Sequence, residues 1–260
     1  MWRVLTAAVC SLKGGVGKTT VVLGLASAAL QRGIDCLLVD LDPQANATTT
    51  VEPAGGSTTI ADVLADPRRS VVKRAVRPTS WGAGLRVLPG SEEAESHNHP
   101  DPGNKRLHRL ALALDKLDPE PELVLIDCPP SLGQLTRSGL VAARRAVLVT
   151  EPTLYSVAGV QRALEAVQAE RASNNKQLQP LGVVINRVRP RAVEHEFRLG
   201  ELRELFGPLV LSPSLPDRAV IQQAEGAGVP IHRWPTSGAR EMAALFDQLL
   251  DRLLRSERRR

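Results

Sequence analysis

The chain has 260 residues, of which 43% are hydrophobic and 23% are charged, a balance typical of a folded globular protein and not of a disordered one. Only 3% of the residues are aromatic, which argues against a stacking platform for single-stranded nucleic acid. The net charge is +5, and it is unevenly distributed: residues 1–130 carry −1 (14 Lys/Arg, 15 Asp/Glu), and residues 131–260 carry +6 (19 Lys/Arg, 13 Asp/Glu). The basic second half indicates either a polyanion-binding surface or a solvated basic face.

Short apolar runs alternate with helical patterns from one end of the chain to the other. The runs are continuous instead of alternating with polar residues, which is typical of strands in a sheet that helices cover on both faces. Strands are predicted at Val4–Cys10, Ile34–Asp40, Leu85–Leu88, Leu123–Asp127, Ala146–Thr150, Leu181–Asn186 and Leu209–Leu211. Helices are predicted at Lys18–Gln31, Thr59–Ala65, Lys105–Leu117, Leu132–Ala143, Val157–Glu170, Val193–Leu205, Arg218–Glu225 and Ser237–Leu254. This order predicts one α/β domain over residues 1–260, a doubly wound, mostly parallel sheet with helices on both faces.

Two other features limit the class of protein. The segment Gly90–Asn104 is polar and rich in proline and glycine, which predicts a surface loop. The cysteines Cys10, Cys36 and Cys128 are odd in number, lie in or beside apolar runs and form no CxxC pair. They are therefore expected to be buried reduced thiols and not disulfide or metal ligands.

A glycine-rich turn with two lysines follows the first predicted strand and opens the first predicted helix. Its glycines allow backbone N–H groups to converge on phosphate oxygens, and the positive end of the helix attracts the same anion. Lys18 is expected to bridge the β- and γ-phosphates of a nucleotide, and Thr19 to bind Mg²⁺. The strict phosphate-loop pattern needs glycine where the chain has Leu12, and an additional lysine follows instead. The residues expected to bind the nucleotide here are Lys13, Gly14, Gly15, Val16, Gly17, Lys18, Thr19 and Thr20.

The sequence KGGVGKTT at residues 13–20, with its early lysine, resembles the deviant Walker A motif of the ParA/MinD-type ATPases, a class of P-loop NTPases that partition plasmids, chromosomes and other cargo. The resemblance extends over nearly the whole chain. Val39–Asn46 is similar to the second-strand motif of that family, and Leu125–Gly133 to its Walker B and switch II segments. Val184–Arg187 and Leu215–Ala219 fall where the family binds adenine. The resemblance implies a Mg²⁺-dependent enzyme that hydrolyses ATP to ADP and phosphate.

Carboxylates follow the predicted strands at the edge where ligands bind in open α/β sheets. Asp127 ends an apolar run and is expected to hold Mg²⁺ through a water. Asp40 and Asp42 end the second strand, and their i, i+2 spacing places them on one side of an extended chain. The resemblance implies that Asp40 positions or activates the attacking water and that Asp42 belongs to switch I. It also implies catalytic roles for Lys13 and Lys18 and adenine binding by Asn186, Pro216 and Asp217.

Lys13 has a further role by resemblance. In the ParA/MinD family this lysine reaches across a dimer interface to the phosphates in the partner's site, as an arginine finger supplied in trans does. The chain is therefore expected to form an ATP-dependent homodimer, in which the phosphates are the shared counterion. The alternative is an ordinary solvent-exposed lysine.

A ParA-like switch would bind DNA non-specifically in its ATP state, and a ParB-like or cargo-adaptor protein would trigger hydrolysis and release. Phosphate binding needs positive charge and not aromatic rings. The candidate DNA contacts are Arg187, Arg189, Arg191, Arg198, Arg203 and Arg218. The alternative is that these arginines pair with glutamates of the same predicted helix, namely Glu194, Glu196, Glu201 and Glu204.

A MinD-like membrane switch is the competing interpretation. Its anchor would be Glu241–Arg260, where apolar residues recur at helical spacing before the basic end Arg258–Arg260. The pattern also fits a packed final helix, which Asp247 and Asp251 favour. We therefore expect a cytoplasmic, nucleoid-associated protein with ATP and Mg²⁺ as cofactors.

Overall fold

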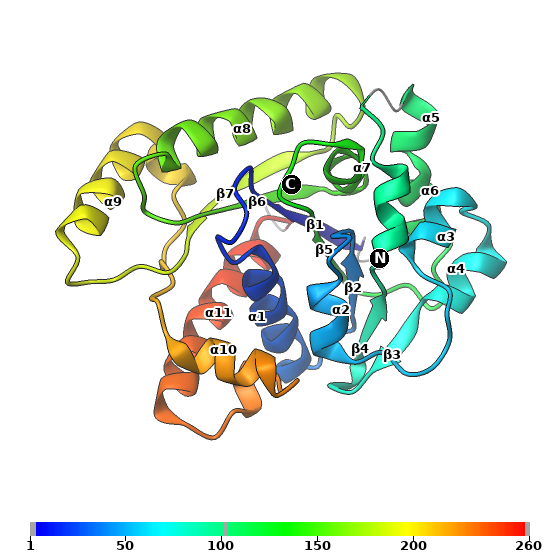
Figure 1. Cartoon of the computed structure of the whole chain (residues 1–260), viewed down its shortest axis with the longest axis horizontal. Coiled ribbons are helices and arrows are strands. Elements are labelled where there is room, and N and C mark those ends of the chain that lie inside the picture. The colour runs from blue at the N-terminus through cyan, green and yellow to red at the C-terminus, as the bar shows by residue number, and fades with distance from the viewer. Residues whose placement is uncertain (1–3, 101–102, 258–260) are drawn as a thin grey trace.

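The computed structural model describes residues 4–100 and 103–257. Seven strands form one sheet in the order β3-β4-β2-β5-β1-β6-β7 (Figure 1). Only the edge pair β3–β4 is antiparallel, and the five other neighbouring pairs are parallel. The strands are β1 (Leu5–Cys10), β2 (Cys36–Asp40), β3 (Arg77–Thr79), β4 (Gly82–Leu88), β5 (Leu123–Asp127), β6 (Arg145–Thr150) and β7 (Gln179–Ile185). The predicted fold class, a mostly parallel sheet covered by helices, is confirmed.

Two apolar clusters cover the two faces of this sheet, which explains why the central strands are continuously apolar. Along β1, Ala7 and Val9 belong to one cluster, and Ala8 and Cys10 to the other. Every residue of β1, β2, β5 and β6 is buried. Because successive side chains of a strand point to opposite faces, burial of all of them requires a helical layer on each side.

The helices divide between these two faces (Figure 1). One layer contains α1 (Lys18–Gln31), α2 (Asn46–Val51), α10 (Ala219–Gly226) and α11 (Ser237–Arg255). The other contains α3 (Ile60–Ala65), α4 (Arg69–Ala75), α6 (Arg109–Leu114), α7 (Gln134–Ala142), α8 (Ser156–Ser173) and α9 (Val193–Phe206). Short helices also occur at η1 (Glu92–His97), α5 (Gly103–Leu107), η2 (Gly207–Leu209) and η3 (Ile231–Arg233).

The helix α11 packs closely against α1 through its apolar face. Met242, Phe246 and Leu250 are each at most 1% exposed, and a Cβ on Gly24 of α1 would collide with the Phe246 ring. The final helix is therefore a packed core helix over its described length, as Asp247 and Asp251 suggested. The basic end of the alternative membrane anchor, Arg258–Arg260, lies outside the described residues.

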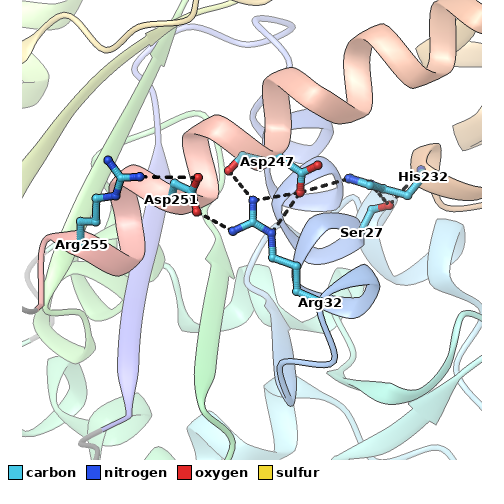
Figure 2. A network of polar contacts seen from close by, with 6 residues as sticks. All are labelled: Ser27, Arg32, His232, Asp247, Asp251 and Arg255. Carbon is cyan, nitrogen blue, oxygen red and sulfur yellow. Dashed lines mark hydrogen bonds and ion pairs between the residues drawn. The ribbon is translucent and has the colours of Figure 1, made fainter.

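Polar contacts also connect α1 and α11 beside their apolar interface (Figure 2). Arg32, just after α1, donates to Asp247 at 3.2 Å and to Asp251 at 2.5 Å. His232 of η3 lies between the two helices: its Nδ1 is 2.7 Å from the Ser27 hydroxyl, and its Nε2 is 3.6 Å from Asp247 Oδ1. These contacts join α1, which begins at the glycine-rich turn, to the end of the described chain.

Several local predictions were wrong. Leu209–Leu211 is not a strand, because η2 ends at Leu209 and Val210 makes only an isolated parallel bridge to Val183. The short elements α2, α4 and β3 were missed, and the predicted helix Lys105–Leu117 is divided between α5 and α6. The predicted loop Gly90–Asn104 contains η1. The cysteines are free and buried, as expected.

Candidate nucleotide-binding site

The glycine-rich turn lies between the carboxyl end of β1 and the first turn of α1, at the centre of the sheet. Gly15 and Gly17 have φ values of 78° and 84°, in the left-handed region that glycine adopts without strain. A Cβ on Gly17 would also collide with the side-chain amide of Asn186. The turn therefore requires glycine for its backbone conformation and for the close approach of Asn186, the residue just after β7 (Gln179–Ile185).

The turn forms one wall of a cavity of about 690 Å³. Lys18 lines the cavity and is only 6% exposed, whereas Lys13, at the start of the turn, is exposed. The opposite wall consists of residues from the segment after β2 and from the end of α10, including Asp42, Gln44, Gln222 and Glu225. A buried lysine beside backbone N–H groups at a helix N-terminus is suited to an anionic phosphate.

Asp127 ends β5 directly beside β1 and β2, and it is fully buried. Its Oδ2 accepts a hydrogen bond of 2.7 Å from the Thr19 hydroxyl, and its buried Oδ1 has no hydrogen-bond partner. Burial, followed by the charge of Asp40, raises the pKa of Asp127 well above its ordinary value. A buried acceptor without a partner is costly in a folded protein. A cation bound at Asp127 and Thr19 would remove that cost.

The residues present fit magnesium together with a nucleotide. Within the described residues, no group of three or more His, Cys, Asp or Glu side chains could hold a metal alone. Mg²⁺ is usually held by one or two protein oxygens together with waters and phosphate oxygens, which matches Thr19 and Asp127. The ion would supply positive charge to phosphate oxygens during hydrolysis.

Asp40 is completely buried at the end of β2, in register with Asp127 of the neighbouring strand. Its Oδ1 accepts from the Asp42 N–H at 3.1 Å, and its Oδ2 accepts from the Thr48 N–H and hydroxyl at 2.8 and 2.7 Å. Burial raises the pKa of Asp40 to about 6, against the lowering effect of these hydrogen bonds. Asp42 is 8% exposed and lines the cavity. The predicted carboxylates thus lie together at one sheet edge.

The residues predicted to bind adenine occupy different surroundings. Asn186 is buried and its amide donates to the Val16 carbonyl at 2.9 Å, so it braces the glycine-rich turn in this structure. Pro216 forms an isolated bridge with Val188, and Asp217 pairs with Arg189 at 2.9 Å. Pro216 and Asp217 are not among the residues that line the described cavity. Their contact with adenine stays a prediction.

Three residues near the candidate site were missed from the sequence, and two of them, Gly90 and Glu225, carried no local signal. Thr48 and Gly90 reach Asp40 only through the fold, since they lie 8 and 50 positions away along the chain. Glu225 lines the cavity, and burial raises its pKa, against a hydrogen bond with Thr20 that lowers it. The threonine run at residues 48–50, directly after the carboxylate motif, was the available signal for Thr48.

The predicted DNA-binding arginines differ in whether they are paired with carboxylates of the chain. Arg187 pairs with Glu151 at 2.9 Å and also bonds the Gly15 carbonyl, so it supports the glycine-rich turn. Arg198 pairs with Glu194 and Glu201, which was the alternative interpretation for this helix. In the described part of the chain Arg191 and Arg203 make no ion pair, and Arg218 lies 3.7 Å from Glu241.

Comparisons with known proteins agree with this site. A family model described as an AAA domain matches residues 4–180. A Mycobacterium tuberculosis protein, Rv1708, is 33% identical over 254 residues, 94% of this chain and 78% of that protein. The chromosome-partitioning ATPase Soj of Thermus thermophilus is 30% identical over 253 residues, 96% of this chain and 97% of Soj.

A solved structure with ligands shows the same fold. Cobyrinic acid a,c-diamide synthase from Mycobacterium smegmatis, with a bound ATP analog and magnesium, superposes with a TM-score of 0.80 at 28% identity, covering 99% of this chain and 97% of that one. The family match and the partition ATPases agree with the motifs and with the geometry of the turn, the buried lysine and Asp127. The chain therefore belongs to the ParA/MinD family of P-loop ATPases and uses ATP and magnesium, and the cavity lined by Lys18 is the candidate site for them.

Proposed function

We propose that the chain is a ParA-type switch that forms a homodimer on ATP, binds DNA non-specifically as that dimer, and is released when a partner protein accelerates hydrolysis. The observation that carries the proposal is the position of Lys13. It is exposed on the same turn whose other lysine, Lys18, is buried against the phosphate site. One lysine serves its own nucleotide, and the other is free to reach the phosphates of a second copy.

Exposed apolar side chains at the same sheet edge support a dimer. Leu132 follows β5 and is 37% exposed, while Leu154 and Tyr155 follow β6 and are 59% and 73% exposed. Because parallel strands end at one edge, these loops lie at the edge that holds the nucleotide site. A second copy related by a two-fold axis would cover them and bring each Lys13 toward the other site.

The DNA surface we propose is smaller than the sequence suggested. Arg191, Arg203 and Arg218 are exposed and are the candidates to neutralise phosphates. Arg187, Arg189 and Arg198 are paired with carboxylates of the chain, so we assign them no DNA contact. The membrane alternative is less well supported, because the apolar face of α11 is buried. Among the described residues, no helix is long and apolar enough to cross a membrane. A cytoplasmic protein on the nucleoid follows from this proposal.

The dimer is tested by light scattering of Lys13→Ala with ATP. To prevent turnover, the substitution is made in an Asp40→Asn background, since we propose that Asp40 positions the attacking water. We expect the parent to be a dimer and the Lys13→Ala form a monomer at saturating ATP. The matched control is Lys73→Ala, which removes an exposed lysine of α4 and should leave the dimer intact. ATP-dependent dimers of Lys13→Ala would refute the assignment of Lys13.

The surface is tested by two assays on the ATP-bound dimer. Filter binding to random-sequence DNA should weaken when Arg191 and Arg218 are both changed to alanine, and the salt dependence should become shallower. The control is Arg198→Ala, whose guanidinium is already paired with Glu194 and Glu201. Flotation with vesicles of anionic lipid is the competing assay. Flotation without DNA retention would favour the membrane switch instead.

A further inference from the structure

A relay of hydrogen bonds connects the loop after β4 to the carboxylate of Asp40. The Gly90 N–H donates to the Thr48 hydroxyl oxygen at 2.8 Å, and that hydroxyl donates to Asp40 Oδ2 at 2.7 Å. The Thr48 N–H donates to the same carboxylate oxygen at 2.8 Å. Three segments that are separate in the sequence thus meet at one buried carboxylate.

The direction of the relay is determined by its chemistry. A threonine hydroxyl has one hydrogen to donate and can also accept. Because the Gly90 N–H can only donate, it occupies an acceptor position of the hydroxyl and leaves the hydrogen for Asp40. Thr48 therefore supplies two donors to one carboxylate oxygen, and the third donor, the Asp42 N–H, fixes the other oxygen.

Gly90 also meets a steric requirement. A Cβ at this position would lie 2.9 Å from Asp40 Cγ and 3.1 Å from Asp40 Oδ2. Contacts under 3.0 Å to a Cβ essentially do not occur, so any other residue would push the carboxylate or the loop aside. The backbone of Gly90 can approach closely enough to bond Thr48 only because the position has no side chain.

We propose that Thr48 and Gly90 are positioning residues for ATP hydrolysis, which hold the Asp40 carboxylate in one orientation toward the nucleotide edge. This inference rests on the proposed role of Asp40 in positioning the attacking water. Neither residue needs to touch ATP for this function. They act through Asp40, whose two oxygens they and the Asp42 N–H hold in place.

The surroundings of Asp40 explain why such a restraint is needed. Asp42 lies two residues after Asp40, and Asp127 on β5 is in register with Asp40. Repulsion from these carboxylates favours rotation of Asp40 away from them, and a water-positioning group must be placed to a fraction of an ångström. Donors from α2 oppose that rotation.

The relay also provides a connection between the nucleotide cavity and Asp40. Thr48 is in α2, and the same segment carries Gln44 and Asn46, which line the cavity. Ala45, the residue just before α2, has a φ of 53°, so the chain turns sharply between Gln44 and Asn46. A shift of this segment when nucleotide binds would move Thr48 and the Asp40 carboxylate together.

The test compares Thr48→Val and Thr48→Ser under single-turnover conditions at saturating ATP. Valine keeps the shape and the backbone N–H but removes the hydroxyl donor, so we expect hydrolysis to fall about tenfold to 100-fold, the range for a lost bond to a charged group. ATP affinity should stay within about twofold of wild type because the phosphate contacts are untouched. Thr48→Ser keeps the donor and should restore most of the rate. Gly90→Ala should reproduce the Thr48→Val defect.

Two controls separate this effect from general damage. Thr79→Val removes another buried threonine hydroxyl, which donates to the Leu85 carbonyl, and Gly159→Ala adds a methyl group where nothing lies within 4 Å. Both should hydrolyse ATP at the wild-type rate. A loss of ATP affinity that parallels the loss of rate in Thr48→Val, or a rate that does not fall, would overturn the proposal.

A double-mutant cycle distinguishes failure of the relay from failure of the proposed role of Asp40. In the Asp40→Asn background, Thr48→Val should have no further effect, since it acts only through that carboxylate. If Asp40→Asn itself hydrolyses ATP normally, the role of Asp40 is refuted. If Asp40→Asn is inactive while Thr48→Val is fully active, the relay alone is refuted.

Discussion

The carboxyl edge of the sheet and the contact between α1 and α11 differ in whether their carboxylates are paired with positive charge. At the sheet edge, Asp127 is fully buried with one oxygen lacking a partner, and Asp40 is its neighbour in register. In the helix pair, Asp247 and Asp251 share the guanidinium of Arg32 (Figure 2). The first region has a buried carboxylate oxygen without a hydrogen-bond partner, which a bound cation would complete, whereas the two aspartates of the second region are already paired without ligand.

The same α1 helix serves both regions. Its first turn carries Lys18 and Thr19 at the nucleotide site, and Gly24 lies under the Phe246 ring six positions further on. Substitutions at the first turn should therefore change function with little effect on folding, and those at the second contact should do the reverse. The predictions below test this separation.

The largest effect is expected for Lys18→Ala. This side chain is 6% exposed beside the glycine-rich turn, and it is the one lysine among the described residues that lines the cavity. We expect ATP hydrolysis to fall by at least about 100-fold, because the charge that we propose faces the β- and γ-phosphates is lost. The thermal midpoint of the nucleotide-free protein should change by no more than about 2–4 °C. A normal rate of hydrolysis with a large loss of stability would contradict the expectation that the first turn of α1 serves function and not folding.

Phe246→Ala should have the opposite profile. The ring is fully buried and fills the space above Gly24, so its removal leaves a cavity between the two helices. The free energy of unfolding should fall by about 3–5 kcal/mol, measured by urea denaturation. The surviving folded fraction should bind ATP with wild-type affinity. Leu245→Ala, on a partly buried residue of the same helix, should cost less.

The sheet could be predicted from sequence because its strands are fully buried and therefore continuously apolar. The edge strand β3 was missed since it has three residues, Arg77–Thr79, with a proline at the centre. The apolar run Leu209–Leu211 was wrongly predicted as a strand, because hydrophobicity reports burial and not hydrogen bonding, and the run makes only one isolated bridge.

The residues of the candidate site also divide into those that a local sequence pattern predicts and those that depend on long-range contacts. The glycine-rich turn and Asp127 are local in the sequence, each with a strand directly before it, and their positions were predicted. The roles of Thr48, Gly90 and Arg187 depend on contacts between distant segments, such as the bond from Arg187 to the Gly15 carbonyl. Charge composition does not reveal such pairing, so the arginines were grouped as DNA contacts although Arg187, Arg189 and Arg198 are paired with carboxylates of the chain.

Asp127→Asn should stabilise the nucleotide-free protein while impairing magnesium-dependent ATP binding. Because the pKa of Asp127 is raised by burial, the folded state loses stability relative to the unfolded state as pH rises from 3.8 through the folded value. Asparagine removes that loss, and the thermal midpoint at pH 7 should rise by about 2–4 °C, equivalent to ~1 kcal/mol. Added Mg²⁺ and ATP should raise the wild-type midpoint and not that of the variant. A midpoint that falls without ligand would contradict this account.

The smallest effect concerns His232, which lies in the polar network between α1 and α11 (Figure 2). Burial lowers its pKa below the ordinary 6.5, although Asp247 acts in the raising direction, and Ser27 and Arg32 are the other polar groups that face it. A lowered histidine pKa means that the folded state binds fewer protons than the unfolded state. Its contribution to stability is therefore complete above pH 6.5 and is lost as pH falls through the folded value.

The substitution His232→Gln tests this reasoning, because glutamine can still bond the Ser27 hydroxyl but does not titrate. At pH 7.5 its free energy of unfolding should lie within about 1 kcal/mol of wild type, the scale of one neutral hydrogen bond. Between pH 7.5 and pH 5.5 the wild type should lose more stability than the variant, measured by urea denaturation at both pH values. An equal loss in the two proteins would place the titrating group elsewhere and would leave the contact between α1 and α11 independent of pH in this range.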